Sequence, residues 1–390
     1  MNNVIEQDGK YIAGTYARFP VEIVRGKGSY LYDGEGKQYI DMGTGIAVNT
    51  FGMCDDAWVE AVEKQLSAFA HTSNLYYTAP CVELAKMLCE RTGMKKVFFS
   101  NSGAEANECA IKAARKYAAE KKGKEYTTIV TLKNSFHGRT LTTLSATGQE
   151  HYHELYQPLT PGFEHVDPNG GCYELEAMAA HVKIAGIMIE CVQGEGGVNA
   201  LDAEFVQYLA AFCKKHDIVL IVDEVQTGNG RSGQLYSYMN FGISPDVVTT
   251  AKGLGGGLPL GATMLGEKVQ SVFGFGDHGS TFGGNPVACA GAVSILSRID
   301  EALLNGVRER SELIFSTLQG AEGVVSVSGM GLMIGIETEK PAKEVLNACM
   351  EKGVLVLTAK NKVRLLPALN IPMDALKQAL DVIKDACKVN

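Results

Sequence analysis

From about residue 55 onward, stretches with helical periodicity alternate with short runs of apolar and β-branched residues. The pattern predicts helices over 55–70, 80–91, 104–120, 173–182 and 203–216, and strands over 96–99, 127–132, 184–189, 218–222 and 247–250. Such alternation is typical of a largely parallel sheet sandwiched between helices. It therefore predicts an α/β fold.

Two flanking parts of the chain depart from this alternation. Residues 1–54 carry strand-like segments broken by glycine turns at 26–28 and 33–34, which predicts a small β-rich segment that packs with a smaller domain. Residues 55–285 form the expected large domain, and residues 286–390 the smaller α+β domain. In that smaller domain, strands are predicted over 332–337, 354–357 and 363–366, with a last helix from Met373.

The amino-acid composition limits which classes of ligand the protein can be expected to bind. The formal net charge is −8, which argues against a nucleic-acid or anionic-membrane surface and favours small-molecule ligands. The N-terminal sequence lacks the layout of a signal peptide, and no apolar run reaches the length of a membrane span. Ten scattered cysteines without a C-x-x-C pair, and eight histidines without paired ligand spacing, indicate a reducing, cytoplasmic setting and no metal site.

The stretch TTAKGLGGGLPLGA places Lys252 in a glycine-rich loop directly after a short strand. Lysine amines form Schiff bases with carbonyl compounds when their pKa is lowered, and a pyridoxal ring is the commonest partner. Asp223 ends an apolar strand, at the edge of the sheet where open α/β folds bind ligands. A carboxylate there suits the ring nitrogen of that cofactor. Taken alone, Asp223 could be a turn cap and Lys252 a solvated charge.

Residues 100–105, Ser-Asn-Ser-Gly-Ala-Glu, turn from a predicted strand straight into a helix. Ser102 and Glu105 have the spacing of a capping box, so Ser102 should cap the helix and Glu105 should reach back. Gly103 and Ala104 leave the first-turn N–H groups open to a phosphate dianion. Taken alone, this fragment is better explained as an ordinary capped helix.

Further polar and aromatic residues follow the carboxyl ends of other predicted strands. Phe136 could stack on a planar ring, and Arg139 could bind a substrate carboxylate through two hydrogen bonds. The alternatives are core packing for Phe136 and a surface ion pair for Arg139. Glu190 and Glu195 complete a set of charges at strand ends, although glycine-rich acidic loops are often plain turns.

Several motifs together resemble one family, the class III (fold type I) pyridoxal-phosphate-dependent aminotransferases, and within it the acetylornithine aminotransferase group of arginine biosynthesis. The motifs are SNLYYTAPCVELAKML, NSGAEANECAIKAARKY, FHGRTLTTLSATG, VQGEGGV, DEVQTGNGRSG, PDVVTTAKGLGGGLPLGA, HGSTFGGNPVACA and VRLLPAL. By this resemblance the chain is expected to have a large, mostly parallel sheet domain and a smaller α+β domain, and to assemble as a homodimer with shared active sites.

The resemblance implies a role for each site residue. Lys252 would carry pyridoxal 5'-phosphate as a Schiff base and shuttle the proton at the reacting carbon. The other expected cofactor contacts are Asp223 to the ring nitrogen, Gln226 to the ring hydroxyl, Phe136 to the ring face, and Gly103, Ala104 and the neighbouring subunit's Thr281 to the phosphate. The expected substrate contacts are Arg139 with Ser280 for a donor carboxylate, and Arg364, masked at rest by Glu195, for 2-oxoglutarate.

Three positions depart from the usual family pattern: Cys191, Asn229 and Ala368. None of them removes a reacting group. The stretch 43–46 lacks the aromatic residue that ornithine aminotransferases use against free ornithine, which favours a donor with a blocked α-amine. The resemblance thus implies a ping-pong exchange between N2-acetylornithine and 2-oxoglutarate. Transamination of 4-aminobutyrate, ornithine or succinyldiaminopimelate remains the alternative. A phosphate-loop nucleotide module is disfavoured, because neither nucleotide-binding glycine motif is present.

Overall fold

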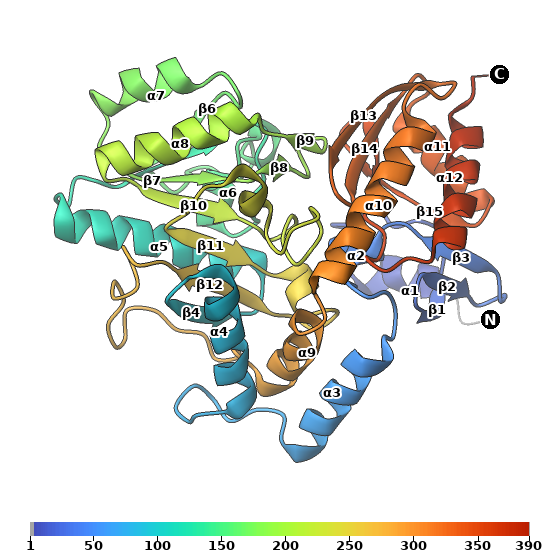
Figure 1. The fold of residues 1–390 in the computed structure, drawn as a ribbon, viewed down its shortest axis with the longest axis horizontal. Coiled ribbons are helices and arrows are strands. Elements are labelled where there is room, and N and C mark those ends of the chain that lie inside the picture. The colour runs from blue at the N-terminus through green and yellow to red at the C-terminus, as the bar shows by residue number, and fades with distance from the viewer. Residues whose placement is uncertain (1–3, 390) are drawn as a thin grey trace.

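The computed structural model describes residues 4–389, which form two lobes (Figure 1). The larger lobe is built on a seven-stranded sheet in the order β4-β12-β11-β10-β7-β5-β6. The strands are β4 (Lys96–Ser100), β5 (Thr128–Leu132), β6 (Phe163–Val166), β7 (Ile184–Ile189), β10 (Val219–Asp223), β11 (Val247–Thr250) and β12 (Gly261–Leu265). Only β12 runs antiparallel to its neighbours within this sheet, which confirms the predicted mostly parallel α/β fold.

Helices cover both faces of this sheet, because its central strands carry apolar side chains on both sides. Along β10, Val219 and Ile221 pack with the alanine-rich face of α5 (Gly103–Lys121). The alternate residues Leu220 and Val222 pack with a larger apolar cluster. That cluster includes side chains from α4 (Ala79–Thr92), α7 (Cys172–Ala179) and α8 (Ala203–His216). The large lobe is therefore a three-layer α/β/α unit.

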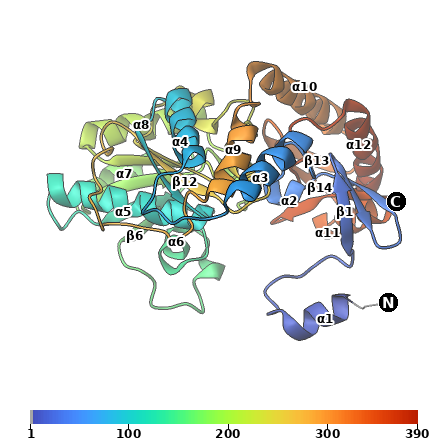
Figure 2. The ribbon, with the colours of Figure 1, turned by 90° about the horizontal axis from the view of Figure 1, so that it is seen from below.

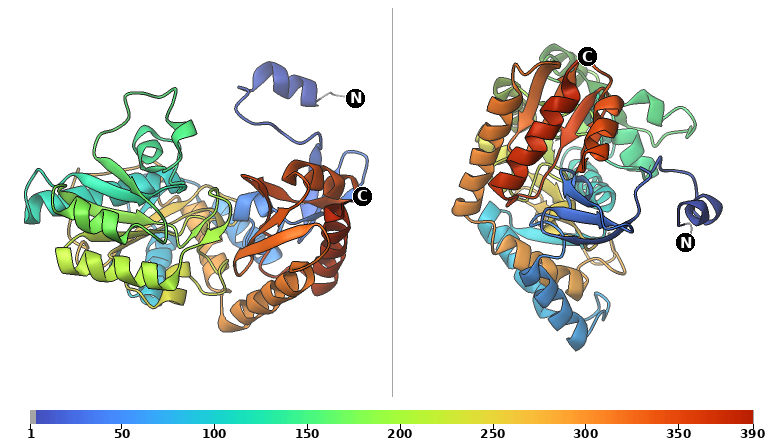
Figure 3. Two further views of the ribbon diagram at one scale, coloured as in Figure 1. Left: turned by 90° about the horizontal axis from the view of Figure 1, so that it is seen from above. Right: turned by 90° about the vertical axis from the view of Figure 1, so that its right-hand side faces the viewer.

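The smaller lobe has its own sheet and apolar core. Its strands are β13 (Val324–Met330), β14 (Met333–Thr338), β16 (Leu357–Ala359) and β17 (Lys362–Leu365), in the order β13-β14-β17-β16. Helices α10 (Glu301–Leu318), α11 (Ala342–Glu351) and α12 (Met373–Cys387) supply most of the remaining core. Figure 3 shows these helices grouped on one side of the small lobe.

The N-terminal strands belong to a further four-stranded sheet. It consists of β1 (Ile23–Lys27), β2 (Tyr30–Asp33), β3 (Gln38–Asp41) and β15 (Val354–Leu355), with β15 parallel to β3. Ahead of it, α1 (Val4–Tyr11) stands away from both lobes and buries none of its residues (Figure 2). The turn α2 (Thr44–Ala47) then leads toward the large lobe.

The predicted domain boundary at 285 falls at a helix start. Asn285 caps α9 (Pro286–Leu296) by accepting hydrogen bonds from Val287 N and Ala288 N at 2.9 and 3.2 Å. The apolar residues of α9 join the large-lobe cluster, where the helix packs on α3 (Asp56–Ala68) and α4. By packing, α9 therefore lies with the large lobe, whereas the predicted boundary assigns it to the smaller domain.

The remaining elements are short. They are α6 (Leu141–Ala146), η1 (Glu150–Tyr152), β8 (Val192–Gln193), β9 (Asn199–Ala200), η2 (Ser237–Phe241) and η3 (Lys252–Leu254). None of the helices within residues 4–389 is long and apolar enough to span a membrane.

Candidate active site

A cavity of about 460 Å³ lies at the carboxyl edge of the large sheet. Segments that follow β4, β5, β7, β10 and β11 all contribute to its wall, as expected for a parallel sheet. Seven of the predicted site residues line it: Gly103, Ala104, Phe136, Arg139, Asp223, Gln226 and Lys252. The structure thus brings together residues that are up to 149 positions apart in sequence, from Gly103 to Lys252.

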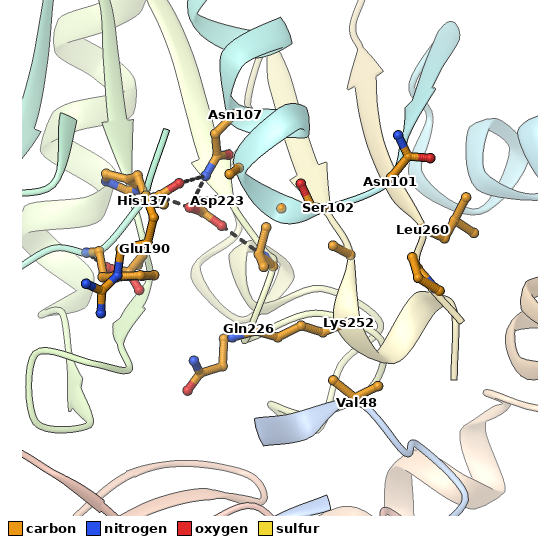
Figure 4. Close-up of a pocket in the computed structure, with 18 of the residues that line it drawn as sticks. Val48, Asn101, Ser102, Asn107, His137, Glu190, Asp223, Gln226, Lys252 and Leu260 are labelled. Atoms are coloured by element: carbon orange, nitrogen blue, oxygen red, sulfur yellow. Dashed lines mark hydrogen bonds and ion pairs between the residues drawn. The ribbon is translucent and has the colours of Figure 1, made fainter. Parts of the chain in front are cut away.

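Lys252 begins the short turn η3, two residues beyond the end of β11. Its backbone has φ 45°, an uncommon value for a residue other than glycine. The side chain extends across the cavity toward Gln226 (Figure 4). Desolvation lowers the pKa of the Lys252 amine to about 8, although the nearby carboxylate of Glu195 opposes that shift. A neutral amine, which is the nucleophilic form, is therefore accessible near physiological pH.

The carboxylate of Asp223 is held by three donors. Its Oδ2 accepts hydrogen bonds from Asn107 Nδ2 at 2.7 Å and from His137 Nδ1 at 2.8 Å. Its Oδ1 accepts one from Val225 N at 3.0 Å. Burial acts to lower the pKa of His137, but the adjoining Asp223 raises it above its ordinary value. These three hydrogen bonds fix the orientation of the Asp223 carboxylate at the cavity wall.

The N-terminus of α5 opens into the same cavity. Ser102 caps the helix, since its Oγ accepts a hydrogen bond from Glu105 N at 3.2 Å. Glu105 reaches back as predicted, although its carboxylate accepts from Asn101 N at 2.7 Å rather than from the Ser102 backbone. The intrahelical ladder begins with Ala106 N donating to Ser102 O, so the earlier N–H groups of Gly103 and Ala104 point out of the helix end. The cavity therefore contains a site suited to an anion.

Phe136 and Arg139 lie on the β5 side of the cavity. The Phe136 backbone N–H donates to Glu190 Oε2 at 2.9 Å, which ties this loop to the end of β7. Burial raises the pKa of Glu190 to about 7. Arg139 is exposed, and its guanidinium carbon lies 4.2 Å from the centre of the Tyr152 ring. An aromatic face and an exposed cation thus border the same space as Lys252.

Glu195 and Arg364 form an ion pair beside Gln226. The distance from Arg364 Nη1 to Glu195 Oε1 is 2.5 Å, and the Arg364 side chain is only 4% exposed. Gln226 joins both partners: its Nε2 donates to Glu195, and its Oε1 accepts from Arg364, each at 3.2 Å. Burial acts to raise the pKa of Glu195, but the guanidinium of Arg364 lowers it below the ordinary value. Glu195 is therefore a carboxylate, and it neutralises Arg364.

Ser280 and Thr281 do not line the cavity that contains Lys252. Ser280 is nevertheless next to it, because its Oγ accepts a hydrogen bond from Asn101 Nδ2 at 3.2 Å. Thr281 is exposed and lines a second, smaller pocket with residues 71–78. Within one chain the structure therefore separates Thr281 from the other predicted phosphate contacts.

Sequence reasoning gave no role to several residues that shape the site. Asn107 and His137 orient Asp223, and Val48 lines the cavity from the N-terminal segment. Asn107 could have been noticed as a polar residue on a helix face otherwise made of alanine, cysteine and isoleucine. Val48 carries no such signal, because its place in the wall depends on how the N-terminal segment packs.

The residues of the cavity fit pyridoxal 5'-phosphate. A nucleophilic amine, an oriented carboxylate, an aromatic face and a helix N-terminus all border one space. Glycine at 103 also matters for the shape of the cavity, because a Cβ there would lie 2.6 Å from Cγ1 of Val225, another lining residue. Among residues 4–389, no group of three or more histidine, cysteine or acidic side chains could hold a metal ion.

Comparisons with known proteins agree with this chemistry. A family model, Aminotransferase class-III, matches residues 11–387. The acetylornithine aminotransferase of Haemophilus ducreyi is 46% identical over 387 residues, or 98% of each chain. The succinylornithine transaminase of Citrobacter koseri is 43% identical over 98% of this chain and 96% of its own. The solved ornithine aminotransferase of Toxoplasma gondii has a TM-score of 0.94 at 29% identity, covering 98% of this chain and 94% of that one.

The match therefore extends from the N-terminal segment through both lobes, and it includes every strand end that borders the cavity. This chain belongs to the class-III aminotransferases, enzymes that work with pyridoxal 5'-phosphate.

Proposed function

We propose that this aminotransferase moves the δ-amino group of N2-acetyl-L-ornithine to 2-oxoglutarate, as a step of arginine biosynthesis. The products are N-acetylglutamate semialdehyde and glutamate. The observation that carries the proposal is a pair of arginines. Arg139 is exposed at the cavity, and Arg364 is neutralised by Glu195. The relative from Haemophilus ducreyi, named for acetylornithine, supports the choice of donor.

Besides Lys252, five positions would hold the cofactor within one chain. The N–H groups of Gly103 and Ala104 would bind its phosphate, and Phe136 would cover one face of its ring. Asp223 would pair with the ring nitrogen, and Gln226 with the ring hydroxyl. When bound, pyridoxal 5'-phosphate supplies an aldehyde carbon that accepts amino groups and a ring that withdraws electrons from the carbon attached to that amino group.

Lys252 serves as both attachment point and proton carrier in this proposal. Its amine has a pKa of about 8, so at neutral pH it can give up a proton and take one back at little cost. Lys252 Nζ removes a proton from the δ-carbon of the donor and later returns one to the carbon of the 2-oxo acid. Asn107 and His137 hold Asp223 in place, so that its carboxylate would face the ring nitrogen.

The two arginines would let one cavity accept two different substrates in turn. Acetylornithine brings one carboxylate, which Arg139 would bind with help from Ser280. Glutamate and 2-oxoglutarate bring a second carboxylate, which Arg364 could bind only after Glu195 moves aside. The Glu195–Arg364 pair would therefore keep glutamate from competing as the first donor.

We also propose that the enzyme is a cytoplasmic homodimer in which Thr281 completes the phosphate site of the partner. Two exposed side chains, Tyr76 and Tyr77, line the pocket that contains Thr281, and their sequence neighbour Leu75 and the residue after Thr281, Phe282, are exposed as well. Clustered exposed side chains of this kind are typical of protein interfaces. All ten cysteines are unpaired, which suits a reducing compartment.

A donor panel tests the substrate assignment. The purified enzyme is assayed with 2-oxoglutarate and, in turn, acetylornithine, succinyldiaminopimelate, ornithine and 4-aminobutyrate. We expect acetylornithine to have the highest kcat/KM. A higher kcat/KM for 4-aminobutyrate or free ornithine would replace the proposed donor, and absence of turnover with every donor would refute the function.

A further inference from the structure

Lys252 is held in an uncommon backbone conformation, and side chains from elsewhere in the fold bind the carbonyl groups of the residues before and after it. Its φ of 45° lies in the left-handed region, which residues other than glycine rarely adopt. The carbonyl oxygen of the preceding residue, Ala251, and that of the following residue, Gly253, each accept a side-chain hydrogen bond. A conformation of this kind persists only where the surroundings hold it.

Thr50 binds the carbonyl of Gly253, the residue after Lys252. Its side chain is almost fully buried, and its Oγ1 donates a hydrogen bond to Gly253 O at 2.8 Å. The backbone of Thr50 is fixed in turn, because its own carbonyl accepts from Leu369 N at 2.9 Å. Thr50 therefore connects the N-terminal segment and the segment after β17 to the loop that carries Lys252.

Asn229 holds the carbonyl before Lys252. Its Nδ2 donates to Ala251 O at 3.3 Å and to Thr250 Oγ1 at 3.0 Å. Asn229 itself has φ 58°, a conformation that asparagine tolerates better than most residues. Its buried Oδ1 has no hydrogen-bond partner within the described chain, so the side chain is placed by its donor group alone.

We propose that Thr50 and Asn229 are positioning residues that clamp the Lys252 backbone from both sides and thereby aim its amine at the cofactor. The inference deepens the proposed function, because it assumes that Lys252 is the cofactor lysine. If either donor were removed, the φ of Lys252 could relax toward an ordinary value. Because the lysine side chain is long, that backbone rotation would displace Nζ. A small displacement of a reacting group is enough to slow a bond-forming step by orders of magnitude.

The test follows capture of pyridoxal 5'-phosphate by the cofactor-free enzyme, measured as visible absorbance over a range of pH. Wild type should capture faster as the pH rises through about 8, the pKa of its desolvated amine. Thr50→Val keeps the shape of the side chain but removes its donor, and it should slow capture by about tenfold or more. Thr50→Ser restores the hydroxyl and should return the rate to near the wild-type value.

A second threonine supplies the matched control. Thr131 is also buried and donates to a backbone carbonyl, Ala146 O, at 2.7 Å, but it does not line the cavity. Thr131→Val should lower the Tm and leave the rate and pH profile of capture unchanged. Equal losses of capture rate in Thr131→Val and Thr50→Val would mean that Thr50 acts only through stability, and the clamp would be rejected.

Asn229→Gly provides an independent test of the clamp, because glycine tolerates the left-handed conformation but lacks the amide that donates to Ala251 O. It should slow capture as Thr50→Val does, and it carries the test if Thr50→Val fails to fold. Wild-type capture rates in both Thr50→Val and Asn229→Gly overturn the clamp and leave the proposed function standing. Failure of the wild type itself to capture the cofactor at Lys252 refutes the proposed function instead.

Discussion

Asp223 illustrates how much a single side chain depends on its neighbours. Both Asn107 Nδ2 and His137 Nδ1 donate to its Oδ2, and all three groups are buried. The Nε2 of His137 has no hydrogen-bond partner within residues 4–389, which is costly for a buried polar atom. The histidine is therefore held in place by Asp223, and its raised pKa reflects that contact.

The masking of Arg364 predicts a change in donor preference. Glu195→Ala removes the carboxylate 2.5 Å from Arg364 Nη1 and leaves a buried guanidinium that can bind a second substrate carboxylate. We expect the ratio of kcat/KM for acetylornithine to that for glutamate to fall by about tenfold, equivalent to ~1.4 kcal/mol. Arg364→Ala should instead impair mainly the 2-oxoglutarate half-reaction. Single-turnover rates with each donor measure both effects. An unchanged ratio in Glu195→Ala would show that the Glu195–Arg364 pair does not control donor choice.

The lowered pKa of Lys252 also predicts how stability depends on pH in the cofactor-free protein. The folded pKa is about 8, below the ordinary value of 10.5. Between these values the unfolded chain binds more protons than the folded protein, so the contribution of this group to the free energy of unfolding rises with pH. Relative to Lys252→Met, wild type should gain up to about 3 kcal/mol from pH 8 to 10.5. Urea unfolding of both proteins measures this, and a constant difference contradicts the shift.

At the scale of elements, the start of α5 does most to shape the phosphate end of the cavity. It follows β4 after only two residues, and Ser102 and Glu105 fix where the helix begins. Gly103 sits directly against Val225, the residue that also donates its N–H to Asp223. Packing at Gly103 is therefore linked both to the proposed phosphate site and, through Val225, to Asp223.

Gly103→Ala should weaken cofactor binding. The added Cβ would lie 2.6 Å from Val225 Cγ1, so either the helix start or the loop after β10 must shift. Overpacking of this kind costs about 1–3 kcal/mol, which corresponds to a five- to 150-fold loss of cofactor affinity if it acts only on the bound form. Titration of the cofactor-free variant gives the Kd. Gly170→Ala, which meets no atom within 4 Å, is the control, and a wild-type Kd for Gly103→Ala would rule out this account of the glycine.

The sequence predicted elements best where periodicity and caps agreed. The helix at 203–216 and the strand at 184–189 occur with the predicted bounds. β12 was not predicted, because Gly261 and the Gly-Pro-rich residues before it are typical of a loop, yet pairing with β4 and β11 makes it a buried strand. Likewise, the roles of Asn107 and Thr50 depend on contacts across 116 and 203 positions, which no local pattern encodes.

At the scale of the whole molecule, the cavity draws on parts of the chain that pack separately. The large lobe provides most of the lining residues, and the N-terminal segment provides Val48. Arg364, on β17 of the small lobe, lies behind the wall and donates a hydrogen bond to the lining residue Gln226. Thr281 alone among the predicted phosphate contacts faces a different pocket, next to exposed aromatic side chains. Completion of the site by a second copy would explain that placement.

Assembly and cofactor affinity should therefore be linked. Dilution that dissociates the proposed homodimer should weaken cofactor binding, because each subunit would then lose the phosphate contact proposed for its partner's Thr281. Thr281→Ala should raise the cofactor Kd by about tenfold without changing dimer dissociation, since one hydrogen bond to a charged group is lost. Thr281→Ser should behave like wild type. Sedimentation and cofactor titration over the same concentration range test this, and a monomer with full affinity would contradict shared sites.

Reduction with borohydride tests the central claim most directly, because it fixes an amine-linked cofactor at the residue that carries it. Treatment of the purified holoenzyme, followed by proteolysis and mass spectrometry, should find the cofactor mass on the peptide that contains Lys252. Lys252→Ala should bind some cofactor through the remaining contacts but yield no labelled peptide and no turnover with acetylornithine. Labelling at another lysine, or full activity in Lys252→Ala, would contradict the account.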